Sequence, residues 1–312
     1  MVRVGLLGYC AAGPLVGLAG SLSALFIAMF VWGAFQGALD VSMNTQAVSV
    51  ERSSARPLMS GFHGCWSIGA FAGAGLGVIG VATGLSLTHQ LLLLGVPVLL
   101  VGVVLTAHML PEGASTASTR DGGRLSVRRL SRPVLVLGGI AFASMLCEGA
   151  SADWASVYLR GPLHSSAATA GLGYTAFALV MVIIRLSGNR LLARFRARRV
   201  LPVLSAIATV GFIAGLIGDR ESAAIAGFAC LGIGLALIVP TVFSAAGRLP
   251  GLNPGTAIAA VSACGWLGFV CGPPLIGGLA SATSLPAALG LLPVLTACIA
   301  VSTGLAFAFR ND

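Results

Sequence analysis

Residues 89–110 read HQLLLLGVPVLLVGVVLTAHML, a run without Asp, Glu, Lys or Arg. A helix needs about 20 apolar residues to cross the hydrocarbon core of a bilayer, and this run has that length. It lacks the strict alternation of apolar and polar residues that a membrane barrel strand requires. Because a chain in lipid must satisfy its backbone hydrogen bonds internally, the run predicts a membrane-spanning helix.

The rest of the chain has the same character. Of its 312 residues, 57% are hydrophobic and only 9% are charged, whereas a soluble domain carries about 25% charged residues. We therefore expect an all-α fold, a polytopic membrane helical bundle of about ten transmembrane helices. The helices are expected near residues 4–20, 23–48, 58–83, 89–110, 133–159, 166–190, 200–217, 222–247, 256–281 and 286–309.

The arginines indicate an orientation in the membrane. All 18 basic residues are arginines, and all but Arg160 and Arg220 fall in one alternate set of helix connections. Cytoplasmic loops carry such an excess of positive charge. We expect a multi-pass protein of the plasma membrane with both termini in the cytoplasm. This placement of charge between apolar runs favours the lipid bilayer as the partner and argues against nucleic acid.

One long polar connection divides the chain. Residues 111–132 are rich in Ser, Thr, Gly and Arg, a composition typical of a flexible linker. We expect an incomplete N-terminal transmembrane bundle at 1–110, a cytoplasmic linker loop at 111–132 and a C-terminal six-helix bundle at 133–312.

A faint internal repeat bears on the first bundle. The pair Arg56-Pro57 after one helix corresponds to Asn253-Pro254 after another, as in transporters built from two parallel halves. The same offset places the counterparts of helices 133–159 and 166–190 before Met1. The repeat therefore predicts a first half that is two helices short, and a chain that is truncated or has a misassigned start.

Three stretches carry a resemblance to a known family. Gly33–Gly77 (GAFQGALDVSMNTQAVSVERSSARPLMSGFHGCWSIGAFAGAGLG) resembles helices four and five of sugar-type major facilitator superfamily proteins. Glu148–Trp154 resembles the start of their second bundle, and Val261–Gly277, with Gly272-Pro273-Pro274-Leu275, resembles their eleventh helix. The likeness is to bacterial inner-membrane relatives of the fucose–proton symporter, in which twelve helices are expected and the third would begin at Met1.

The resemblance implies a secondary transporter that works by alternating access. Its substrate would be a small polar solute, a sugar by resemblance, with protons as the coupling ion and a monomer as the working form. The alternative is a truncated or degenerate fragment that acts, if at all, in membrane interaction or sensing. The sequence shows no clustered catalytic groups, no nucleotide-binding motif and no metal-ligand spacing, so we expect no enzyme activity, cofactor or metal.

Polar residues inside the predicted helices are the candidate site residues, because a charge at the bilayer centre is costly and persists only with a partner or a cavity. Gln36, Asp40 and Asn44 recur at intervals of four and form one stripe. By resemblance, Asp40 occupies the position of a carboxylate that couples transport to protons. A low dielectric disfavours the charged form of a carboxylate, which suits a group that carries a proton. The alternative is a buried Asp that fixes helix packing.

Two further groups could bind solute or protons. His63 and Trp66 lie one turn apart on one helix, where an imidazole could relay a proton and an indole could stack on a sugar ring; His63 could equally bond a backbone carbonyl. Glu148 falls near mid-membrane and is a second candidate carboxylate. Asp153, nearer the helix end, could bind solute or merely cap or pair near the interface.

Residues near the end of the helix 166–190 are candidates for gating or structure. Arg185 is expected to extend to the cytoplasmic surface or to make a gate contact. By resemblance, the segment from Gly188 to Arg196 corresponds to a loop signature in which an acid is usual where this chain has Ala193, followed by Arg194. The gating contact of that acid is therefore in doubt here.

Overall fold

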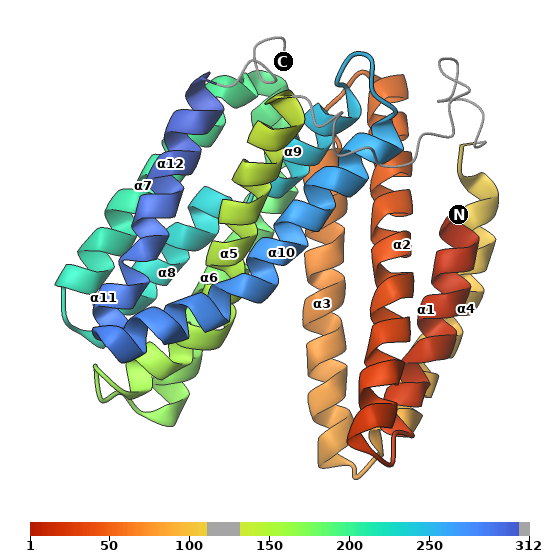
Figure 1. The fold of residues 1–312 in the computed structure, drawn as a ribbon, viewed down its shortest axis with the longest axis horizontal. Helices are drawn as coiled ribbons and strands as arrows, with labels where there is room; N and C mark the ends of the chain where they lie inside the picture. The colour runs from red at the N-terminus through yellow and green to blue at the C-terminus, as the bar shows by residue number, and fades with distance from the viewer. Residues whose placement is uncertain (111–131, 306–312) are drawn as a thin grey trace. The chain divides into compact units, whose positions relative to one another are not determined.

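The computed structural model describes residues 1–110 and 132–305, and the regular structure within these ranges is helical (Figure 1). The helices are α1 (Val2–Gly17), α2 (Leu22–Ser54), α3 (Met59–Ala82), α4 (Leu87–Leu105), the short η1 (Thr106–His108), α5 (Arg132–Arg160), α6 (Ala167–Arg194), α7 (Ala197–Ile217), α8 (Glu221–Leu235), α9 (Ile238–Gly247), α10 (Pro254–Ala282), α11 (Leu285–Leu289) and α12 (Leu291–Leu305). Eight candidate membrane spans occur in the described ranges, with α8 and α9 forming one and α11 and α12 another. The predicted all-α bundle of about ten membrane helices is confirmed.

Part of the predicted organisation falls outside the described residues. The predicted linker 111–132 does so except for Arg132, which begins α5. The end of the last predicted helix, beyond residue 305, does so as well. The division into 1–110, 111–132 and 133–312 stays a prediction.

The chain forms two compact units. The first consists of Met1–Ser54 and the segment that begins at Trp66; the second consists of Ala55–Cys65 and the helices from α5 to α12. In the first unit α1 packs against α2 and α4. Gly5 on α1 allows this approach, since a Cβ there would lie 3.1 Å from the backbone of Leu39.

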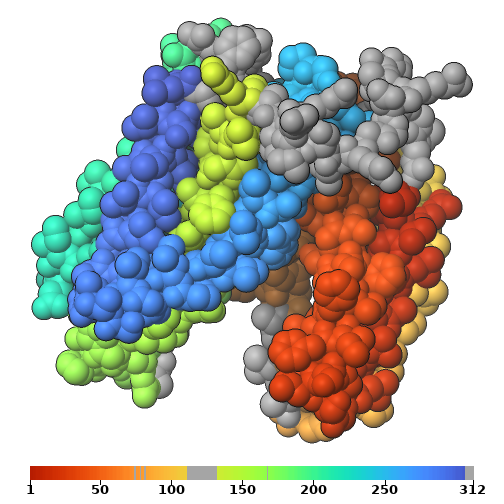
Figure 2. All heavy atoms as spheres, in the orientation of Figure 1, coloured from red at the N-terminus to blue at the C-terminus, as the bar shows by residue number. Residues whose placement is uncertain are grey.

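In the second unit, a seam of glycines brings α5 and α10 together. A Cβ at Gly272 would lie 2.7 Å from the carbonyl oxygen of Leu146, and one at Gly149 would lie 2.6 Å from that of Phe269. Gly268 packs still closer, on the carbonyl of Phe142. Small residues at such spacing let membrane helices approach closely, and Figure 2 shows α10 (blue) lying against α5 (yellow-green). The seam fixes the part of α5 that carries the candidate carboxylate.

Local signals in the sequence set the helix starts. The hydroxyl of Ser166 accepts a hydrogen bond from the amide of Thr169 at the start of α6. The side chain of Asn253 accepts one from Gly255, and Pro254 follows as the first residue of α10. Capping satisfies amides that have no partner within the helix, and proline at the first position has no amide hydrogen to satisfy.

The segment predicted as one helix near 222–247 is broken. α8 ends at Leu235 and α9 begins at Ile238. Pro240 has no amide hydrogen, so the carbonyl of Ala236, four residues earlier, loses its donor within the helix. All ten residues of α9 are buried, including the polar residues Thr241 and Ser244. The prediction was right about the span and wrong about its continuity.

Candidate functional site: polar groups within the helices

The polar stripe of α2 lies in the first unit. Asn44 is buried, and Gln36 and Asp40 are half-buried. The amide nitrogen of Asn44 donates to the backbone carbonyl of Asp40 at 2.9 Å and to its carboxylate Oδ1 at 3.1 Å. Gly33 and Gly37 on the same helix have open space where a Cβ would stand. The arrangement presents a carboxylate and two amides along one helix.

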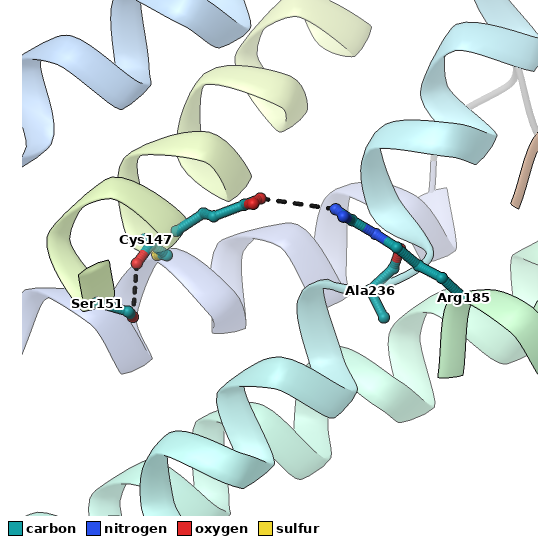
Figure 3. A network of polar contacts seen from close by, with 5 residues as sticks. Cys147, Ser151, Arg185 and Ala236 are labelled. Atoms are coloured by element: carbon teal, nitrogen blue, oxygen red, sulfur yellow. Dashed lines mark hydrogen bonds and ion pairs between the residues drawn. The ribbon is translucent and has the colours of Figure 1, made fainter. Parts of the chain in front are cut away.

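An ion pair between helices is the main polar feature of the second unit. Nη2 of Arg185 on α6 lies 3.7 Å from Oε2 of Glu148 on α5. The side chain of Arg185 is 4% exposed and that of Glu148 is 17% exposed. The distance is that of an ion pair and is too long for a hydrogen bond. Figure 3 shows the guanidinium of Arg185 reaching toward α5.

The guanidinium has a second partner at the break between α8 and α9. Nε of Arg185 donates to the carbonyl oxygen of Ala236 at 3.2 Å (Figure 3). The donor-less carbonyl that Pro240 leaves in the helix is thus paired by a cationic side chain. The side chain of Arg185 is buried among α5, α6 and the helix break, and its predicted gating or structural role stays a prediction.

The segment 55–65 packs on α6 beside this arginine. The hydroxyl of Ser60 donates to the backbone carbonyl of Arg185 at 2.6 Å, and the amide of Gly61 donates to Oδ1 of Asn189 at 2.9 Å. The ring of His63 lies 5.8 Å from that of Phe243 on α9. The sequence candidates His63, Glu148 and Arg185 therefore belong to one compact unit.

Other candidates lie apart from these contacts. Trp66 is 53% exposed, and Asp153 is exposed near the end of α5. Ala193 and Arg194 form the exposed last turn of α6, which continues beyond the predicted end, and the guanidinium of Arg194 lies over the ring of Phe195. Within the second unit, the structure does not bring Asp153, Ala193 or Arg194 to the ion pair.

Several groups at this site escaped the sequence reasoning. Ser60 and Asn189 hold the segment 55–65 on α6, and their role depends on a contact between elements about 125 residues apart. Ser144, by contrast, is expected from its spacing on the side of α5 that carries Glu148; its hydroxyl is buried without a hydrogen-bond partner in the described part of the chain. The Ala236 carbonyl did have a signal, because Pro240 within an apolar run predicts a free carbonyl four residues earlier.

The arrangement offers acid–base groups in helices that are long and apolar enough to cross a membrane. A buried carboxylate can bind and release a proton, and a guanidinium beside it responds to that change of charge. Amide, hydroxyl and carboxylate groups can also bond the hydroxyls of a polar solute. In the described ranges, no three metal-ligating side chains come together.

Comparison with known proteins places these features in context. Residues 137–312 match the family model of the Major Facilitator Superfamily. An MFS-type transporter of Yersinia pestis is 34% identical over 94% of this chain and 75% of its own length. A transporter of Sinorhizobium fredii is 32% identical over 92% of this chain and 75% of its own length.

Solved structures share the fold. The Escherichia coli fucose:proton symporter superposes with a TM-score of 0.80, at 18% identity, over 97% of this chain and 82% of that one. The human organic anion transporter MFSD10 gives a TM-score of 0.74, at 15% identity, over 97% of this chain and 76% of that one. At these identities the likeness is one of fold.

Proposed function

Because this chain belongs to the Major Facilitator Superfamily of membrane transporters, we propose that it moves a small polar solute, such as a sugar, across the bacterial plasma membrane together with protons. The observation that carries the proposal is the pair of buried Arg185 and half-buried Glu148 within membrane-spanning helices. Intramembrane ionisable groups are costly, and in transporters they mark proton and substrate pathways.

Two carboxylates would share the work. Glu148 in the second unit forms an ion pair with Arg185. Asp40 in the first unit accepts a hydrogen bond from Asn44. Both interactions depend on the charge of the carboxylate. A protonated carboxyl donates a hydrogen bond, whereas a carboxylate only accepts. A change of protonation therefore changes which contacts each helix can make, and such differential contacts can shift a two-state equilibrium.

Solute recognition would use the neutral polar groups. Gln36 and Asn44 line α2 with Asp40, and His63 lies in the second unit close to Arg185. Trp66 is exposed on α3 and could stack on a sugar ring, and Asp153 could bond hydroxyls near the end of α5. This chain shares the fold of a fucose:proton symporter, so a sugar is the first solute to test.

The arginine distribution supports an orientation in which both termini face the cytoplasm. Arg185, Ala193 and Arg194 on α6 would have gating or structural roles. Alternating access would proceed by one bundle rocking against the other around a site near the midplane. The working form would be a monomer.

Solute-driven proton flux tests the proposal. The purified full chain is reconstituted into liposomes that hold a pH-sensitive dye, and L-fucose, then other hexoses, pentoses and small polar solutes, are added outside. We expect at least one solute to acidify the lumen. Asp40→Asn should remove that flux, because the amide cannot take up the proton, whereas Ser53→Ala, exposed on the same helix, should keep it.

The other outcomes are equally informative. Solute uptake without proton movement would reject proton coupling and keep transport. If no solute in the panel moved or exchanged, the chain would be better described as a membrane interaction or sensing protein.

A further inference from the structure

The carbonyl oxygen of Ala236 is the feature that carries this inference. In a continuous helix it would accept a hydrogen bond from the amide of residue 240. Residue 240 is proline, which has no amide hydrogen. Nε of Arg185, from the neighbouring helix α6, donates to this oxygen at 3.2 Å. A charge-assisted hydrogen bond thus replaces the missing helical one.

The same guanidinium faces the carboxylate of Glu148. A guanidinium presents its N–H groups in a rigid, planar fork. Holding Nε on the Ala236 carbonyl therefore also fixes the direction of Nη2, which lies 3.7 Å from Oε2 of Glu148. The place of the cation beside the carboxylate depends on a backbone oxygen that lacks its helical donor, because residue 240 is proline.

Packing around the helix break leaves the guanidinium little freedom. Arg185 is 3% exposed, and Ala236, Leu237 and all of α9 are buried. Gly188 on α6 lies against the side chain of Leu237, so α6 and the break are in direct contact. The backbone carbonyl of Arg185 is held in turn by the hydroxyl of Ser60. The arginine is fixed at its backbone and at its head group.

We propose that Arg185 is a positioning residue for the Glu148 carboxylate, and that Pro240 sets its position by freeing the Ala236 carbonyl. The proposal rests on the proposed function only in giving Glu148 a proton to exchange. When Glu148 takes up a proton, the attraction to Arg185 is lost while the bond to Ala236 remains. The guanidinium thus keeps its place beside Glu148 in both protonation states, held by the Ala236 carbonyl.

Two other titratable groups lie near the pair, one on the segment 55–65 and one on α6. His63, in the segment 55–65, lies within electrostatic range of Arg185. Tyr174 on α6 lies within range of Glu148, Arg185 and Asp153. α9 has no charged residue. Experiments on the pair are therefore run at one fixed pH in every variant.

A double-mutant cycle between residues 185 and 240 tests the proposal in the full chain reconstituted in lipid. The readout is the infrared band of the Glu148 carboxylate, isolated by subtracting the spectrum of Glu148→Gln. Pro240→Ala returns an amide to the helix and should shift this band, although it alters no polar side chain. In an Arg185→Gln background, Pro240→Ala should produce no further shift. Pro202→Ala, at another proline inside a helix of this unit, is the matched control and should leave the band unchanged.

The conservative variant separates position from charge. Arg185→Lys keeps the positive charge but lacks the fork, so it should fail to restore the wild-type band. A wild-type band in Arg185→Lys would overturn the proposal. So would an unchanged band in Pro240→Ala, or an equal shift from Pro240→Ala with and without Arg185.

Hydrogen exchange provides an independent readout at the break. Arg185→Gln should lower the protection of the amides of residues 237–239 and 241–242 by on the order of tenfold to a hundredfold, the scale of one lost hydrogen bond to a charged group. Arg190→Gln, exposed on the same helix, should leave it unchanged; an equal loss in both variants would count against the proposal. Neither readout needs a solute, so a failed proton-flux assay with an intact cycle would reject the proposed function alone.

Discussion

The polar groups of the two units are held in different ways. In the first unit, Asn44 bonds to Asp40 one turn earlier on the same helix. In the second, Glu148 and Arg185 come from α5 and α6, and the Ala236 carbonyl comes from the junction of α8 and α9. The bond between Asn44 and Asp40 needs only that α2 be helical, whereas the contacts of Arg185 exist only when several elements are packed together.

Burial follows the same division. Of the most apolar window of α2, 11% is buried, against 67% of that of α5. A charge pair in so enclosed a place requires partners, and the loss of one partner leaves the other uncompensated. The comparison predicts that substitutions at the second cluster lower the stability of the fold strongly, and that substitutions at the first lower it only slightly.

The largest effect is expected from Arg185→Gln. This change removes both the ion pair to Glu148 and the bond to Ala236, and breaking a buried pair costs about 3–5 kcal/mol. Thermal unfolding in detergent should show a clear loss of stability. The double variant with Glu148→Gln should recover part of it, because no unpaired carboxylate then remains.

Arg190→Gln serves as the control, since surface changes usually stay within about 0.5 kcal/mol. If Arg185→Gln and Arg190→Gln unfolded at the same temperature, the contacts of Arg185 would not stabilise the second cluster, and the predicted difference between the two clusters would be wrong.

An intermediate effect is expected at the seam that supports Glu148. Gly268→Ala places a methyl group against the backbone carbonyl of Phe142 on α5, and overpacking of this kind costs about 1–3 kcal/mol. Gly278→Ala on the same helix has open space around the new methyl group. It should leave the unfolding midpoint unchanged or raise it, since alanine favours helix. If both variants unfolded at the same temperature, close packing of α5 and α10 would not support the site.

The smallest effect is expected in the first unit. Asn44→Ala removes hydrogen bonds within a single helix, each worth about 0.5–1.5 kcal/mol. The unfolding midpoint should fall slightly, well short of the change in Arg185→Gln. A loss as large as that of the buried arginine would mean that Asn44 is tied to more than its own helix.

The same distinction explains what the sequence could predict. The apolar runs predicted the helices, and the i, i+4 spacing of Asp40 and Asn44 predicted that they share one stripe, because both depend on local geometry. Contacts between helices were beyond reach: Glu148 was expected near mid-membrane, but its pairing with Arg185 was not. For Arg185, position along the chain was the only guide, so its burial against the junction of α8 and α9 was not predicted either. The break at Ala236 could have been predicted from Pro240.

The most direct measurement compares two transport modes of Glu148→Gln in liposomes, with a solute that drives proton flux in the wild-type chain. Solute-for-solute exchange needs no net proton transfer, whereas accumulation against a gradient does. The account predicts that the variant retains exchange and loses proton-driven accumulation. Accumulation at the wild-type level would contradict it, since protons would then be coupled without the Glu148 carboxylate.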